Sequence, residues 1–140
     1  MPWHRFVKHN VKYRPDKNRL GYDPRKDSVH SDIDIIAVDK INGEVHVVSC
    51  KSWQDGFRIR NMLRWIETGN KRRVRDLVSD RWKESFLKTI KRETGKKDFT
   101  YVIAVTKLLQ EEEKSKLEQE ITKAFKAKNS DVKLEILTLE

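Results

Sequence analysis

Residues 31–53 read SDIDIIAVDKINGEVHVVSCKSW, and they decide the fold because they predict two apolar strands joined by a tight turn. Asn42-Gly43 separates the two apolar runs and is the strongest short signal for a two-residue hairpin turn, in which both residues need positive φ. Asp34 lies on the first run, and Lys51 ends the second. We therefore expect a β-hairpin that carries opposite charges at the end away from its turn.

The turn determines which side chains of the two strands face each other. A two-residue turn places Asp34 opposite Lys51, with Ser49 beside them on the same face of the sheet. A longer turn that pairs Val38 with Val45 shifts the register by two residues and keeps that face, whereas a shift by one residue sends Asp34 to the other face. Both of the first two geometries bring an aspartate, a serine and a lysine together.

The two strands are otherwise apolar on both faces, which is typical of strands that are covered on both sides. Cys50 alternates with its neighbours and is expected in the core as a small buried residue. A charged pair such as Asp34 and Lys51 in apolar surroundings needs an ion, a partner or a chemical role.

Asp34 on one strand, followed by Ser49-Cys50-Lys51 on the next, resembles the PD-(D/E)xK nuclease superfamily. The resemblance covers residues 31–53 closely and the rest of the chain only in the order of its elements. It implies a restriction-endonuclease-like fold and a DNA endonuclease that depends on Mg²⁺ or Mn²⁺. The catalytic residues that it implies are Asp34, Ser49 and Lys51, and the residues that it implies for the metal are Asp34, Ser49 and Cys50.

Ser49 stands where the superfamily pattern has an acidic residue. Mg²⁺ is held by one or two carboxylates with water and substrate phosphate, so a hydroxyl in place of a carboxylate should weaken the ion and impair cleavage. Three alternatives follow: the acid has migrated to a position such as Asp55 or Glu67, the sequence carries an inactivating substitution, or the protein binds nucleic acid without cutting it. Asp32 is a further source of negative charge.

Length and composition bound the class of protein. We expect 140 residues to form a single domain over residues 1–140. No apolar run approaches the roughly 20 residues that cross a bilayer, and the first residues lack the apolar core of a signal peptide. These features predict a soluble cytoplasmic protein without membrane association. The single cysteine excludes an internal disulfide.

The net charge of +9 is unevenly distributed along the sequence. Residues 31–55 carry two Lys against five Asp and Glu, whereas residues 56–92 carry twelve Lys and Arg against four acids. An acidic segment between basic ones is expected of a metal site flanked by phosphate-binding surface, so nucleic acid, above all DNA, is the predicted partner. The residues predicted to contact phosphates are Arg25, Lys26, Arg72, Arg73 and Arg75.

Hydrophobic periodicity predicts the remaining elements. Strands are expected at residues 4–13, 98–106 and 132–139, helices at 54–68, 71–93 and 109–128, and a loop at 14–30. This order predicts a single α/β domain with a mixed central sheet flanked by helices. The nuclease fold usually has a helix before the first strand, for which this chain begins too late. Either that helix is missing or a second subunit supplies its packing surface, which would make a homodimer.

Overall fold

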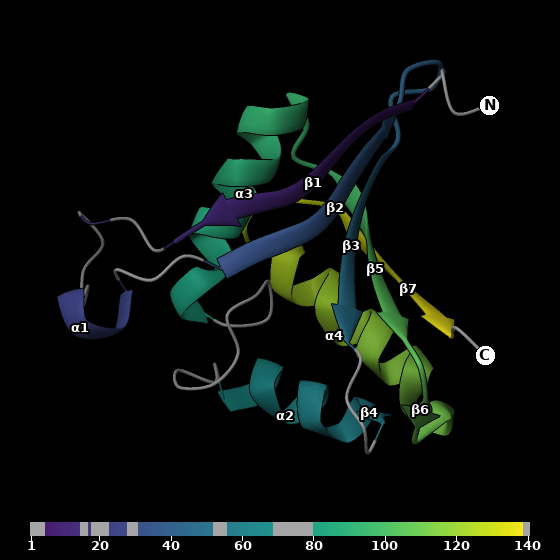
Figure 1. Cartoon of the computed structure of the whole chain (residues 1–140). Coiled ribbons are helices and arrows are strands. Elements are labelled where there is room, and N and C mark those ends of the chain that lie inside the picture. The colour runs from purple at the N-terminus through teal and green to yellow at the C-terminus, as the bar shows by residue number, and fades with distance from the viewer. Residues whose placement is uncertain are drawn as a thin grey trace.

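The computed structural model describes residues 5–14, 17, 23–27, 31–51, 56–68 and 80–138 (Figure 1). Five strands form one sheet in the order β1-β2-β3-β5-β7. Their bounds are Arg5–Tyr13 (β1), Ser31–Asp39 (β2), Val45–Lys51 (β3), Phe99–Val105 (β5) and Val132–Thr138 (β7). The first three strands are antiparallel neighbours, whereas β3, β5 and β7 run parallel. The predicted mixed sheet is confirmed, and its last strand, β7, lies at an edge.

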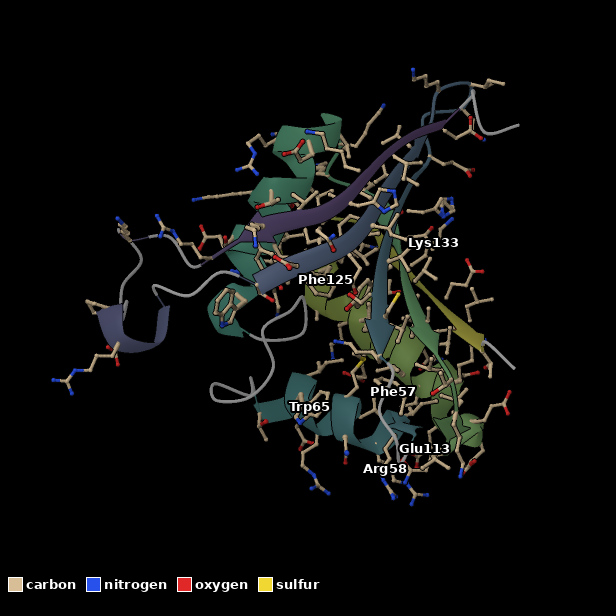
Figure 2. All side chains as sticks on the ribbon, viewed as in Figure 1. Phe57, Arg58, Trp65, Glu113, Phe125 and Lys133 are labelled. Atoms are coloured by element: carbon tan, nitrogen blue, oxygen red, sulfur yellow. The ribbon has the colours of Figure 1, made fainter. Side chains whose placement is uncertain are left out.

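The longer helices are α2 (Ile59–Thr68), α3 (Asp80–Thr94) and α4 (Lys114–Lys126), accompanied by the short α1 (Pro24–Asp27) and the 3-10 helix η2 (Glu111–Glu113). Of the longer helices, α3 and α4 contact strands of this sheet, and α2 packs on α4. Phe86 of α3 meets Tyr13 of β1 and Tyr101 of β5 edge to face, with ring centroids 5.2 and 6.1 Å apart. Lys83 Nζ lies 5.2 Å from the ring centroid of Phe125 in α4, behind the sheet (Figure 2). One hydrophobic cluster therefore joins α3 and α4 to the strands.

The sequence of α4 explains its limits and its buried face. Glu111–Glu113 precede it, and Lys123 and Lys126 lie in its last turn, which matches the helix dipole. The buried side chains recur every four residues and are Leu117, Ile121 and Phe125. The predicted helix at 109–128 is confirmed, although Leu108–Leu109 form a short strand (β6) before it.

The region after β3 differs from the prediction in detail. The predicted helix at 54–68 begins only at Ile59, because Phe57–Arg58 (β4) pair in parallel with β6. The predicted helix at 71–93 is observed from Asp80 to Thr94, and residues 69–79 lie outside the described part of the chain. Gly95, at φ +73°, follows Thr94 and ends α3.

The predicted two-residue turn of the β2–β3 hairpin is wrong. Val38 pairs with Val45, and Asp39 N donates to Glu44 O at 2.9 Å. The loop between the strands therefore contains four residues, 40–43. Only Gly43 has the positive φ, +73°, that a type I′ turn requires of both central residues. The register is the one expected for the longer turn, so Asp34 of β2 is not opposite Lys51. Asp34 still lies near the last residues of β3.

Strict alternation along β1 and β2 is interrupted at one level of the sheet. Ile33 and Ile36 are both fully buried although they are three residues apart. Across from them, Asn10 has φ +51°, and the pairing of β1 with β2 passes over Asn10 and Asp34. A residue in this left-handed conformation reverses the facing of the strand. On β2, core side chains therefore face the helices on both sides of the interruption, with Ile33 before Asp34 and Ile36 after it.

The described helices cover one face of the sheet. Ile35, Val48 and Val102 form a row on the face opposite the cluster to which α2, α3 and α4 contribute. The apolar strands predicted helices on both faces of the sheet. Among the described residues, helices cover only one face. None of the described helices has both the length and the apolar character needed to span a membrane.

Candidate functional site at the fork between β2 and β3

The two strands of the hairpin separate at the level of Asp34. Their pairing ends with Ile35 and Val48, whereas the same register would continue with Asp34 opposite Ser49 and Ile33 opposite Cys50. Instead, Asp34 Oδ2 accepts the Cys50 backbone N–H at 2.8 Å. The carboxylate of Asp34 thus lies in the fork between the strands, where it replaces a main-chain carbonyl as acceptor. The predicted proximity of Asp34 to the Ser49–Lys51 segment is confirmed in this form.

Ser49 is buried and already hydrogen-bonded. Its side chain lies on the helix-covered face with Val47, and the residue is only 7% exposed. The hydroxyl of Tyr101, which is fully buried in β5, donates to Ser49 Oγ at 3.0 Å. The position that the superfamily pattern gives to an acid therefore holds one half of a neutral, buried hydrogen-bonded pair.

Lys51 and Cys50 end β3 on opposite faces. Lys51 is half-buried and pairs in register with Val105 of β5. Cys50 is exposed, so its predicted burial in the core is wrong. The physical reason is the direction in which the side chain points. Cys50 alternates with buried Ser49 and so lies on the face opposite the helices, at the level where β2 has separated from β3.

Within the described ranges, Asp32 and Glu67 form no metal-binding cluster with Asp34. Asp32 is exposed, and its Oδ1 lies 3.5 Å from Lys12 Nζ. Glu67 is exposed near the end of α2, and Asp55 lies outside the described residues. Across the described ranges, no three side chains of the types His, Cys, Asp and Glu are placed to hold a metal ion together.

These donors do not fit the divalent ion that the resemblance implies. Mg²⁺ prefers hard oxygen ligands in near-octahedral geometry, and a cysteine thiol such as that of Cys50 suits softer metals. Asp34 supplies one carboxylate, with one of its oxygens engaged by the Cys50 N–H. The hydroxyl of Ser49 is engaged by Tyr101. Among the described residues, no cluster of three or more His, Cys, Asp and Glu side chains completes a site around Asp34.

The predicted phosphate-binding residues are only partly within the described structure. Arg72, Arg73 and Arg75 lie outside it. Arg25 is exposed on α1, and Lys26 is placed in the same short helix by its backbone. Of these five residues the structure therefore describes only Arg25 and Lys26, and both lie on α1 and not on β2 or β3, which form the fork.

Other basic side chains are exposed on α2 and α3. Those on α2 and the preceding strand are Arg58, Arg60 and Arg64, and those on α3 are Lys88, Lys91 and Arg92. Arg60 is committed to neighbouring acids, since its Nε donates to Glu113 Oε1 at 3.0 Å and its Nη2 lies 3.7 Å from Glu112.

Tyr101 is the residue of this site that sequence reasoning missed. Its signal was a tyrosine within a run that otherwise consists of apolar residues and threonine, FTYVIAV, because a buried phenol needs a hydrogen-bond partner. The partner, Ser49, lies on a neighbouring strand, and only the parallel register places it within reach.

No protein-family model, no curated protein and no solved structure was found to match this chain.

Proposed function

We propose that this chain is a nucleic-acid-binding domain of the PD-(D/E)xK type that hydrolyses phosphodiester bonds weakly or not at all. The observation that carries the second part is the buried Ser49–Tyr101 pair. At the position of the second acid, this pair places two neutral hydroxyl groups that are hydrogen-bonded to each other. An ion held by Asp34 alone would lack the charge that a second carboxylate provides.

The distribution of charge supports nucleic acid as the partner. The chain carries a net charge of +9 and many exposed Lys and Arg, whereas the fork holds the acidic Asp34. Phosphate contacts from such side chains supply affinity that does not depend on sequence. The resemblance to DNA nucleases favours DNA as the substrate class.

A second candidate is Mg²⁺- or Mn²⁺-dependent DNA cleavage, and the position of Asp34 favours it. A half-buried carboxylate stands at a fork in the sheet and contacts the backbone of the residue between Ser49 and Lys51. Lys51 would orient water and stabilise developing negative charge. The missing carboxylate would then have to come from outside the described residues, such as Asp55.

Binding and cleavage assays separate these candidates. We expect a labelled DNA duplex to bind with an affinity that falls steeply with salt, because several cationic contacts release counterions. Arg72, Arg73 and Arg75 changed together to Ala should weaken binding and leave the fold intact. With Mg²⁺ or Mn²⁺ we expect little or no cutting of plasmid or single-stranded DNA. Robust cutting by the wild type that Lys51→Met abolishes would establish the second candidate, and salt-independent or undetectable binding would overturn the first.

A further inference from the structure

A depression of about 440 Å³ lies between α3 and the segment that follows α4. Lysines from three separate parts of the chain line it: Lys88 and Lys91 from α3, Lys97 from the loop before β5, and Lys128 from the turn after α4. Glu84 is the acidic residue of its lining. Four positive charges against one negative charge thus border a single hollow, which we name the lysine groove.

The single acid does not neutralise this groove. Glu84 Oε1 lies 3.8 Å from Lys88 Nζ, one helical turn away. Lys91, Lys97 and Lys128 make no ion pair with any residue that the structure describes. Like charges held around one hollow repel one another, and an anion in the hollow would relieve that repulsion.

Another depression of the molecule offers a contrast. It has a volume of about 290 Å³ and lies at the beginning of β3, β5 and β7. Its lysines, Lys96 and Lys133, are accompanied by Glu44, Asp98 and Asp131. The excess of positive charge is therefore a property of the lysine groove and not of every hollow in this basic protein.

The C-terminal end of α4 borders the lysine groove, but its carbonyl groups repel an anion less strongly than those of an uncapped helix end would. Phe125 O accepts the N–H groups of Lys128 and Ser130 at 2.9 and 3.0 Å, and Lys126 O accepts that of Asn129 at 3.0 Å. Asn129, at φ +59°, permits this closing turn. These carbonyls, which carry the negative end of the helix dipole, are thus already satisfied within the protein.

The lysine groove and the fork lie at opposite ends of β5. Lys97 comes shortly before Phe99, where β5 begins, and Val105 at its other end pairs with Lys51. Seven strand residues at about 3.3 Å each separate the two sites by roughly 20 Å. Each strand of a DNA duplex carries one phosphate per about 3.4 Å of helix axis, so that separation corresponds to about six base pairs along the duplex.

We propose that the lysine groove binds backbone phosphates of the same polynucleotide that the fork faces, a proposal that rests on the proposed function. A polynucleotide fits better than a small anion because the lining lysines are exposed, come from separate segments and surround an open hollow. Such flexible point charges select for phosphate charge rather than for the shape of a ligand. The groove extends the contact surface across the helix-covered side of the domain.

The test compares two triple variants that carry the same change of charge. Lys91, Lys97 and Lys128 are changed to Gln in the groove variant. In the control variant the changes are made at three exposed lysines outside the groove: Lys116, Lys123 and Lys133. Lys133 projects from β7, the edge strand farthest from β1 (Figure 2).

Binding is measured by fluorescence anisotropy with a labelled duplex of about 20 base pairs, at several salt concentrations. We expect the groove variant to lose affinity by about tenfold or more relative to the control variant. The slope of log K against log salt should fall by about 2 to 3, because each lost phosphate contact removes about 0.9. Circular dichroism and thermal melting verify that both variants are folded.

The outcomes separate the two proposals. Equal losses in the groove and control variants, with the wild type binding, would reject the lysine groove and leave the proposed function standing. A wild type that binds neither duplex nor single-stranded DNA would reject the proposed function, and with it the groove. A loss confined to the groove variant supports both.

Discussion

Changing Ser49 to Glu would place a second carboxylate beside the fork, in a position that is 7% exposed and touches Tyr101. The longer side chain must enter a packed site, and overpacking of this kind typically costs about 1–3 kcal/mol. Tyr101 can still donate to a carboxylate oxygen, so that hydrogen bond is retained. Without a divalent ion, the variant should therefore be less stable than the wild type, partly because the charge of Asp34 is nearby.

An ion that binds only the folded variant should reverse this loss. At a free concentration of about 100 times its dissociation constant, such an ion stabilises the folded state by about 2.7 kcal/mol. For a chain of this size, each kcal/mol raises the melting temperature by about 2–4 °C. Scanning calorimetry of Ser49→Glu should thus show a rise of roughly 5–10 °C on addition of Mn²⁺.

Ser49→Gln is the matched control, since glutamine has the size of glutamate without its charge. It should be destabilised to a similar degree and show no melting shift with Mn²⁺ beyond that of the wild type. The double variant Asp34→Asn, Ser49→Glu should also lose the shift, because one of the two carboxylates has been removed. If Ser49→Glu responds to Mn²⁺ no more than Ser49→Gln does, the fork is not an ion site that lacks one acid.

Two further contacts can be tested separately. Tyr101→Phe should lower the free energy of unfolding by about 0.5–1.5 kcal/mol, and a double-mutant cycle with Ser49→Ala should recover most of this as coupling; additive losses would mean that the bond contributes little. Lys8 Nζ donates to Glu93 Oε2 at 2.6 Å, and this hydrogen bond and the lysine charge lower the pKa of Glu93. The folded-state pKa is thus depressed, so Lys8→Met should cost about 0.2–1 kcal/mol at neutral pH. That cost should disappear as the pH falls from about 4.3 through the lowered pKa; a cost that persists in acid would contradict the ion pair.

The parts of the fold that the sequence predicted are those specified by local pattern. The β-branched and aromatic run of β5 and the four-residue spacing in α4 each describe one element, and both were found. The hairpin register was not predictable from Asn42-Gly43 alone, because backbone bonds between Asp39 and the loop decided the length of the turn. The interruption of the β1–β2 pairing at Asn10 and Asp34 was not predicted either, because the positive φ of Asn10 has no unambiguous signature in the sequence.

The candidate site was predictable to a similar extent. Period-two alternation placed Asp34 near the end of β3, which the fork retains. The same alternation put Cys50 in the core only on the assumption that both faces are covered, and the exposed thiol shows where that assumption failed. The Ser49–Tyr101 pair and the lysine groove join residues far apart in the sequence, so they follow from tertiary packing that no local pattern encodes.

In the fork, the side chain of Asp34 takes the place of a main-chain carbonyl as hydrogen-bond acceptor. The rate at which the Cys50 amide exchanges with solvent therefore depends on the side chain at position 34. The Cys50 N–H is held by Asp34 Oδ2 at 2.8 Å, so its hydrogen–deuterium exchange should be slow although the Cys50 side chain is exposed. Asparagine presents an amide oxygen with the same reach, so Asp34→Asn should keep this amide protected while it removes the charge. Asp34→Ala removes the acceptor, so the Cys50 amide should exchange rapidly with solvent. The closure of the sheet at this point and the negative charge of the site can therefore be changed independently, by two substitutions of one residue.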